Sequence, residues 1–301
     1  MIRSKSSSRG SRRARRLKLI MAVMAVAICL SLAVLAIANR AGRFPTKKRE
    51  TAAVSQRSNI AQRFDKNVHI RRGQLWPHLK DAFEVLGDRL DTSGKERITL
   101  TGQASGESTS DFILVQEFPA RVRFQQQGNA QPKTIAFDGR EGWKLGGNPD
   151  RFESAVLETL VYDSVDRLFI AQATGAPTRF LGSRFRLDDG NTEGANAPAY
   201  DVYQVNEQVN VGRETRSQTR SYYLNSETLL LERVRYELER DGARTSVEVL
   251  LSDWREVQEQ KIPFRITRLE DGKPIMILTV AAAAIGPRMS DGIFNQPQGN
   301  R

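Results

Sequence analysis

The chain has 301 residues, of which 39% are hydrophobic and 27% charged, so it is long enough to bury the core of one or two domains. Its net charge of +11 is unevenly placed: residues 1–50 hold thirteen lysines and arginines beside one acid, leaving 33 basic and 34 acidic residues in 51–301. A nucleic-acid-binding domain carries its positive charge on a folded face. This distribution therefore excludes that class and favours contact between the N-terminal region and anionic lipid.

The N-terminal region has the pattern of a membrane anchor. Residues 1–18 are rich in serine and arginine and are predicted to form a basic, disordered cytoplasmic arm. The stretch from Leu19 to Ala38 holds twenty residues without a charge, which as a helix would measure about 30 Å, the thickness of a hydrocarbon core. That length favours an uncleaved transmembrane helix over a signal peptide. The triplet Ala36-Ile37-Ala38 keeps the alternative open, a signal cleaved near Ala38.

The flanks of this segment predict its orientation. Eight lysines and arginines precede it, which favours a cytoplasmic N-terminus and places the remaining chain on the other side of the membrane. The only cysteine, Cys29, lies inside the apolar segment, so no intramolecular disulfide is possible. Residues 39–72 are polar, with isolated apolar side chains, and are predicted to be a stalk.

The first helix of the folded part is predicted to begin at Pro77, because proline suits the first turn of a helix. Leu79, Phe83, Leu86 and Leu90 then fall on one face at helical spacing. The polar run 91–94 is expected to end this helix. The pattern after it alternates with period two. It predicts strands, with a tight turn at Asp138-Gly139, over residues 96–102, 111–118, 120–127, 133–138 and 141–145.

A second helix is predicted to interrupt the strands. Asp150 and Glu153 form a capping-box pattern, and Gly175 with Pro177 ends the apolar stripe that follows. Alternating segments then resume over 179–187, 199–206, 217–224, 228–239, 245–255, 261–269 and 274–283. This order predicts an α+β fold: one large, curved antiparallel sheet, a half-open β-barrel, with two helices packed on its concave face.

Motifs of catalysis and metal binding are scarce. The chain has two histidines, neither of them in the predicted sheet, and it lacks the spacings of zinc sites, phosphate-binding loops and nucleophile elbows. Two acidic pairs are weak candidates for a site. Asp163 with Asp166 is placed on the polar face of the second helix, and Asp188 with Asp189 in a hairpin turn. The prediction is therefore a protein that is not an enzyme, with no catalytic residue, cofactor or metal site.

Several short motifs, taken together and in order, resemble the LolA/LolB-like family of periplasmic lipoprotein carriers. They are Phe137-Asp138-Gly139 with Trp143, the run 222–234, the segments 252–257 and 261–266, and Phe294 with Pro297. The resemblance covers 73–297. It implies a half-barrel whose helices form a lid over a hydrophobic cavity for lipid or lipoprotein acyl chains, in the envelope of a bacterium. This sequence departs from the family at 257–261, where the turn lacks the usual glycine.

We therefore predict a binding protein of the bacterial inner membrane, anchored by Leu19 to Ala38, whose domain lies in the periplasm and holds lipid or an acylated protein. The predicted anchor disfavours a soluble shuttle and favours a fixed receiver or sensor. The alternative is a protein-interaction or envelope-stress-sensor domain with a filled core. Strand positions expected to face inward include Leu250 and Trp254. The residues predicted to line the cavity are Trp143, Phe152, Leu157, Phe169, Tyr236 and Phe264.

Overall fold

The computed structural model describes residues 75–87, 96–106, 108–118, 120–127, 132–187, 197–211, 214–240, 242–287 and 291–296. The chain divides into two compact units, Met1–Gln56 and Arg57–Arg301, and every described element belongs to the second. The predicted cytoplasmic arm, the membrane segment Leu19 to Ala38 and the stalk lie outside the described residues. Among the helices that are described, none is both long and apolar enough to cross a bilayer.

Three α-helices and twelve strands make up the described domain. The helices are α3 (Pro77–Val85), α4 (Arg151–Tyr162) and α5 (Val165–Ala173), with a short 3₁₀-helix η2 (Asp291–Ile293) near the C-terminus. The strands are β1 (Glu96–Ser105), β2 (Thr109–Glu117), β3 (Arg121–Gln127), β4 (Lys133–Phe137), β5 (Gly142–Lys144), β6 (Thr178–Arg186), β7 (Ala199–Val211), β8 (Glu214–Asn225), β9 (Leu231–Arg240), β10 (Ala243–Val257), β11 (Gln260–Glu270) and β12 (Lys273–Pro287). The predicted strands are thereby confirmed, with ends shifted by a few residues.

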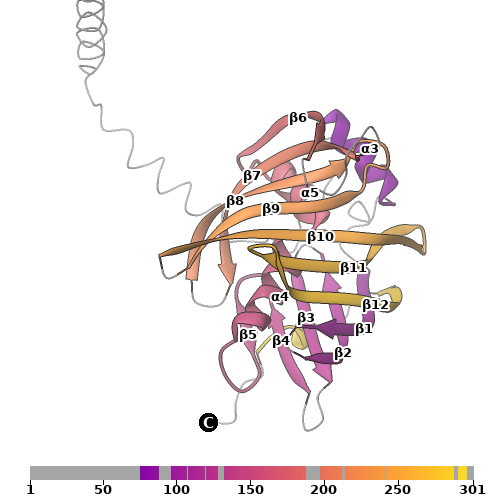
Figure 1. The fold of residues 1–301 in the computed structure, drawn as a ribbon. Helices are drawn as coiled ribbons and strands as arrows, with labels where there is room; N and C mark the ends of the chain where they lie inside the picture. The colour runs from indigo at the N-terminus through magenta and orange to yellow at the C-terminus, as the bar shows by residue number, and fades with distance from the viewer. Residues whose placement is uncertain are drawn as a thin grey trace, which may run out of the picture. The chain divides into compact units, whose positions relative to one another are not determined.

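All twelve strands form one antiparallel sheet in the order β5-β4-β3-β2-β1-β12-β11-β10-β9-β8-β7-β6. The chain builds outward from β1 to the edge strand β5, crosses the sheet through α4 and α5, and returns from the opposite edge, β6, to β12. Strand β12 then pairs with β1. Figure 1 shows the curved sheet with α4 and α5 behind it. The predicted α+β fold with an open, curved sheet is confirmed.

Strict alternation along the strands separates an inner from an outer face. In β11, every second residue from Gln260 to Glu270 is buried, and the residues between them are half-buried or, at Arg265, exposed. The buried apolar side chains of the strands and of the three helices form one continuous core. That core draws on β1 to β4, β7 to β12 and all three helices, and each of these elements lies within the compact unit of residues 57–301.

Helix α4 begins at the predicted capping box. The backbone N–H of Glu153 donates to Asp150 Oδ1 at 2.9 Å, and the backbone N–H of Asp150 donates to Glu153 Oε2 at 2.8 Å. Both otherwise unpaired amides are satisfied, so the start of the helix is fixed. At Asp163 and Ser164, however, the predicted second helix breaks, and Ser164 caps a separate helix α5 through its side chain. The stripe therefore belongs to two helices.

Two further expectations from the sequence are wrong. Helix α3 ends at Val85, with Gly87 at φ +85° following, and so stops before the run 91–94; Leu90 lies outside the described residues. In β10, Leu251 is buried whereas Leu250 is on the outer face, opposite to the prediction. Leu250 is out of phase because the buried residues of this strand are Val247, Val249 and Leu251. Asp253, whose φ is +54°, is left out of the pairing with β11, but the register is the same on both sides of it.

Candidate functional site

Five polar side chains meet where α4 crosses the inner face of the sheet, and we call them the inner ion cluster: Glu158, Asp163, Arg220, Tyr236 and Arg268. The two arginines, from β8 and β11, are fully buried. Arg220 donates from Nε to Asp163 Oδ1 and from Nη2 to Glu158 Oε1, each at 2.8 Å. Arg268 donates from Nη2 to Glu158 Oε2 at 3.2 Å. Two carboxylates of one helix therefore neutralise two guanidinium groups of the sheet.

Tyr236 of β9 ties these charges together. Its hydroxyl accepts a hydrogen bond from Arg268 Nη1 at 2.8 Å and donates to Asp163 Oδ2 at 3.3 Å. The guanidinium of Arg220 lies 4.4 Å from the centre of the tyrosine ring, a cation–π distance. Burial, followed by the nearby carboxylates Asp163 and Glu158, raises the pKa of Tyr236 well above its usual value. The phenol therefore stays protonated and can serve as acceptor and donor at once.

Further ion pairs extend the cluster toward solvent. Arg216 of β8 donates to Glu158 at 2.7 Å, and Glu270 of β11 accepts from both Arg268 and Arg151, the latter at 2.5 Å. A separate pair, Arg167 with Glu207, joins α5 to β7. Helices α4 and α5 are thus each fixed to a strand by charge as well as by apolar packing.

The two carboxylates of the cluster have opposite pKa shifts. Burial opposes the ionisation of Glu158, but Arg268, Arg220 and Arg216 together lower its pKa to about 2. For Asp163, burial is the largest effect and outweighs Arg220 and Arg268, while the charge of Glu158 acts in the same direction as burial, so that its pKa rises to about 6. Asp163 is therefore the member of the cluster that titrates nearest to neutral pH.

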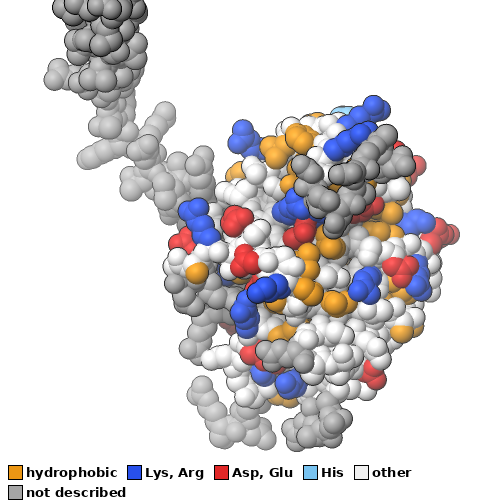
Figure 2. All heavy atoms as spheres, viewed as in Figure 1, with side chains coloured by type: hydrophobic (Ala, Val, Ile, Leu, Met, Phe, Trp, Pro, Cys, Tyr) orange, Lys and Arg blue, Asp and Glu red, His pale blue; other side chains and the backbone are white. Residues whose placement is uncertain are grey.

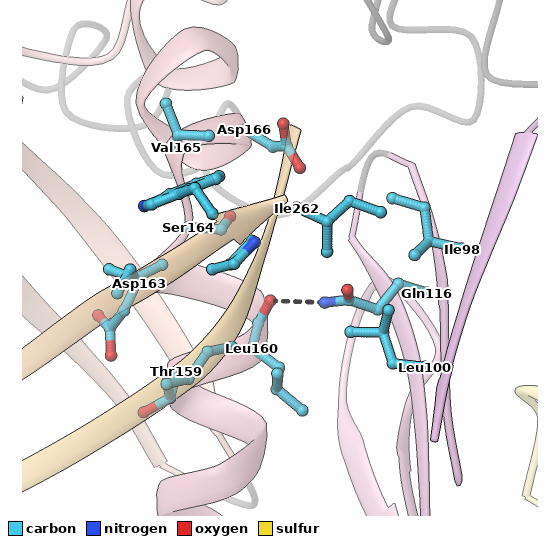
Figure 3. A pocket seen from close by; sticks show the side chains of 14 residues that line it. Ile98, Leu100, Gln116, Thr159, Leu160, Asp163, Ser164, Val165, Asp166 and Ile262 are labelled. Atoms are coloured by element: carbon cyan, nitrogen blue, oxygen red, sulfur yellow. Dashed lines mark hydrogen bonds between the residues drawn. The ribbon is translucent and has the colours of Figure 1, made fainter. Parts of the chain in front are cut away.

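An apolar cleft adjoins the cluster at the break between α4 and α5. Its walls come from β1, β2, β10 and β11 on one side and from residues 159–160 and 163–166 on the other, and its volume is about 50 Å³. Figure 3 shows Ile98, Leu100 and Gln116 facing the helix break, where Gln116 Nε2 donates to the backbone oxygen of Leu160 at 3.4 Å. The strand side chains that line it are Ile98, Leu100, Gln116, Leu251, Trp254, Ile262, Pro263 and Ile266.

Trp254 brings a hydrogen-bond donor to the residues that line this cleft. Its indole Nε1 is buried and has no hydrogen-bond partner among the described residues. A buried donor without a partner loses the hydrogen bonds that it makes in water, so such groups are rare in folded proteins. Here the donor belongs to a residue that lines the cleft, so a ligand that gained access to the buried Nε1 would find an unpaired donor.

The six residues predicted to line a cavity are not brought together. None of them lines the apolar cleft. Leu157 is fully buried in α4, and Phe169 of α5 packs edge-on against Phe83 at 5.3 Å. Tyr236 belongs to the inner ion cluster. Three others lie elsewhere: Trp143 donates from Nε1 to the backbone oxygen of Phe294 at 2.7 Å, Phe152 closes over Gly106, and Phe264 lies 4.3 Å beneath Arg255. That these six contact a ligand stays a prediction.

The acidic pairs also differ from expectation. Asp163 is buried, with its charge turned toward Arg220, whereas the sequence placed it with Asp166 on the polar face of the helix. The placement was wrong because the helix ends at Asp163, which is its C-cap residue. Asp188 and Asp189 lie outside the described residues. Among those described, no three histidine, cysteine, aspartate or glutamate residues are grouped to hold a metal ion.

The sequence did contain a signal for the cluster. Arg268 is in phase with the inward residues Ile262, Phe264 and Ile266, and Arg220 is in phase with Tyr222 and Leu224. An arginine at an inward position of an alternating strand needs a buried partner. The phase of β10, by contrast, has no comparable signal, because Leu250 and Leu251 are adjacent and both apolar, so either could be the inward residue.

No protein-family model matches the chain, and neither does any curated protein. Among solved structures it is similar to a LolA superfamily protein from Nitrosomonas europaea, at 11% identity and a TM-score of 0.47, over 72% of this chain and 97% of that one. It is also similar to a domain from Vibrio parahaemolyticus named for outer membrane lipoprotein sorting, at 8% identity and a TM-score of 0.42, over 75% and 97%.

A third similar structure is a DUF1329 family protein from Desulfovibrio piger, at 10% identity and a TM-score of 0.40, over 72% of this chain and 96% of that one. The first of these structures is described by the name of the family that the sequence motifs resemble. At these identities and TM-scores the similarity carries nothing about the ligand, which depends on the side chains of this chain.

Replacing Arg220 with methionine should destabilise the domain by about 3–5 kcal/mol, because it leaves Asp163 and part of the Glu158 charge buried without compensation. Urea unfolding of residues 57–301 measures this. The matched control is Arg255→Met, which removes an exposed pair with Asp253 and should leave the unfolding midpoint nearly unchanged. Adding Asp163→Asn to Arg220→Met should restore part of the loss. An equal loss in the single and double variants would assign the effect to packing alone.

Asp163 should also give the domain a specific pH dependence. A carboxyl whose pKa is raised from 3.8 to about 6 on folding contributes most to stability when protonated, and that contribution is lost as pH rises from about 4 to 6. Stability of the wild type relative to Asp163→Asn should therefore fall by about 2 kcal/mol between pH 4 and pH 7, since a tenfold change in an acid dissociation constant corresponds to about 1.4 kcal/mol and part of the effect is already lost at pH 4. Urea titrations of both proteins across this range test it, and parallel curves would contradict it.

Proposed function

We propose that the folded domain binds an acyl chain, carried by a lipid or by an acylated protein, in the apolar cleft between the α4–α5 break and strands β1, β10 and β11. The proposal assigns no covalent chemistry to the domain. It goes with the family resemblance of the motifs in 73–297, whose carriers hold acyl chains in such a half-barrel. Physical support comes from the side chains that line the cleft.

The observation that carries the proposal is the composition of the cleft. Its strand wall is made of aliphatic and aromatic side chains, with Gln116 as the one polar residue, and the indole N–H of Trp254 has no partner among the described residues. The helix side of the cleft is more polar and consists of Thr159, Leu160, Asp163, Ser164, Val165 and Asp166. A hydrocarbon chain gains about 0.8 kcal/mol for each methylene that it buries against such a wall. The ester or amide carbonyl at the head of the chain could accept a hydrogen bond from Trp254. One apolar wall with one donor fits an acylated ligand.

The inner ion cluster limits where such a ligand can lie. Glu158, Arg220 and Arg268 occupy the centre of the inner face. A hydrocarbon chain inserted among them would separate these charged groups from their partners and offer no hydrogen bond or counter-charge in exchange. The ligand is therefore confined to the side of the cluster that faces β1, β10 and the first half of β11. A volume of about 50 Å³ is below the roughly 300 Å³ of a small-ligand site, so binding requires the α4–α5 break to move outward.

The small volume of the cleft also supports a second candidate function. If the break does not move, the inner face is a filled core, and the domain functions through its surface, as a protein-interaction or envelope-stress-sensor domain. The well-packed helices and the small cleft favour this alternative in the conformation described. The two candidates are separated by asking whether purified residues 57–301 carry lipid in native mass spectrometry and take up a fluorescent fatty acid. The acyl-chain proposal is wrong if the purified protein carries no lipid and does not take up the fluorescent fatty acid.

Filling the cleft should weaken acyl binding selectively. Ile98→Trp places a large ring at the cleft wall and should exclude about two methylenes of ligand, which lowers affinity for a fluorescent fatty acid roughly tenfold. Ile113→Trp is the matched control, because Ile113 is equally half-buried but lies on the outer face of β2, opposite Thr101. Its affinity should stay within about twofold of the wild type. Equal affinities of the two variants would place the ligand somewhere other than the cleft.

We also propose that the full chain is held at the inner membrane of a bacterium by the segment Leu19 to Ala38, with the domain in the periplasm. The uncharged length of the segment and the eight basic residues before it support this. Expressed in a Gram-negative bacterium, the full chain should stay with the membranes after extraction at alkaline pH, and its N-terminal residue should precede Leu19. A soluble periplasmic protein that begins just after Ala38 would replace the anchor by a cleaved signal and make a diffusing carrier the better description.

A further inference from the structure

The edge strand β6 carries a concentration of exposed apolar side chains. Phe180, Leu181 and Phe185 are 38%, 43% and 44% exposed, and they account for three of the five large hydrophobic residues exposed in the described part of the chain. Phe180 is supported from beneath by Tyr203 at 5.0 Å and by His78 of α3 at 5.6 Å. Figure 2 shows hydrophobic and basic side chains next to each other at the end of the domain where β6 and α3 lie.

Two irregularities turn these side chains outward. The pairing of β6 with β7 shifts between Phe180 and Gly182 and again between Gly182 and Phe185. Leu181 is therefore an extra residue without a partner on β7, and Arg184 has φ +57°. Phe180 lies opposite Tyr203 on the inner face, whereas Phe185 lies opposite Tyr200 on the outer face. The apolar side chains thus project from both faces of one edge.

Positive charge alternates with this apolar surface. Arg179, Arg184 and Arg186 are all exposed, and residues 178–187 contain no acidic side chain. No ion pair of these three guanidinium groups is found within the described ranges. Aromatic and leucine side chains interleaved with arginine are the composition of segments that lie in the interface of an anionic bilayer, where the apolar groups enter the acyl boundary and the cations contact head groups.

We propose that β6 is a docking edge for the surface of an anionic membrane. A peptide strand from another protein is the main competing occupant, because β6 is the last strand of the sheet and pairs with no further strand among the described residues. Two bulges within nine residues interrupt the regular row of amides and carbonyls that such a strand would need, and bulges are a known protection against edge pairing. A membrane surface requires no hydrogen-bond register. The three exposed arginines, which form no ion pair within the described residues, further favour an anionic partner; the nearest carboxylate recorded at the strand is that of Asp201 on β7, which accepts from the backbone N–H of Arg184 at 3.4 Å.

The proposed membrane contact at β6 does not involve the acyl-chain cleft, so it can be measured separately with a fluorescent label on β6. Residues 57–301 lack Cys29, so a single cysteine can be placed at Leu181→Cys and labelled with an environment-sensitive fluorophore. Adding vesicles that contain about one-third phosphatidylglycerol should shift the label to the emission of an apolar environment, and vesicles of phosphatidylcholine alone should not. The matched control is Leu145→Cys, an exposed leucine beside β5 at the opposite edge of the sheet, which should show no shift.

Variants separate the contribution of charge from that of apolar contact. Replacing Arg179, Arg184 and Arg186 with glutamine should lower vesicle affinity about a hundredfold, at about fivefold for each arginine. The same three substitutions at Arg140, Arg244 and Arg265, which are exposed elsewhere, should lower it less than about threefold, although the net charge changes equally. Leu181→Ser should cost about tenfold. A cooperative thermal transition for each variant shows that it is folded.

Three outcomes would overturn the proposal. Labels at 181 and 145 that respond alike to anionic vesicles would mean non-specific adsorption. Equal losses in the two arginine triples would mean that net charge alone governs binding. A label at 181 that becomes buried without vesicles, in proportion to protein concentration, would mean that the edge pairs with a second copy of the chain. The cleft variant Ile98→Trp should retain vesicle binding in full, so failure of the acyl-chain proposal leaves this one intact.

Discussion

The inner ion cluster is the constraint on which the rest of the domain depends. Two arginines occupy inward positions of β8 and β11, where water cannot reach them. A buried guanidinium without a counter-charge would cost more free energy than most domains have to spare, so the carboxylates of Glu158 and Asp163 must lie directly above them. Because one acid lies in α4 and the other caps its C-terminus, this requirement sets the helix at one height and one rotation against the sheet.

The position of α4 matters because this helix belongs to the connection between the two edges of the sheet. The chain leaves the sheet at β5 and has to rejoin it at β6, on the opposite edge, so the intervening residues must cross the inner face. Apolar packing alone would allow α4 to slide along such a face. The ion contacts, which require matched distances, select one position out of many. They also fix where α4 ends, and therefore where the break at Asp163 and Ser164 falls.

Asp163 is therefore part of the inner ion cluster and also lines the apolar cleft. Its carboxylate is bonded to Arg220 and Tyr236, while the residue itself also borders the apolar cleft. An outward movement of the break between the helices, which binding in the cleft requires, would lengthen these bonds to β8 and β9. The inner face is thus divided into a charged half, which holds the helix, and an apolar half, which is available to a ligand. A uniformly hydrophobic half-barrel would have no such division.

The strands could be predicted because alternation and turn residues are local. Pairs such as Asp138-Gly139 and Asp271-Gly272 separate hairpins, and the residues between them alternate cleanly. What could not be predicted depends on residues distant in sequence. Arg268 contacts Glu158 across more than a hundred residues, so its partner could not be named from local pattern. The adjacent leucines Leu250 and Leu251 gave no indication of which one faces inward, and the capping of α5 by Ser164 divided a stripe that is continuous in the sequence.

The pairing of β1 with β12 has a consequence for how the domain is made. Leu100 lies beside Ala283, and Gly102 approaches the backbone of Thr279 so closely that a methyl group there would lie 2.0 Å from its carbonyl oxygen. The first strand of the sheet therefore gains its second neighbour only when the last strand has been synthesised. Until then one edge of β1 offers its amides and carbonyls to any other strand. Contacts of such long sequence separation form slowly, so joining this seam is the step during which the nascent chain is most exposed to mispairing and aggregation.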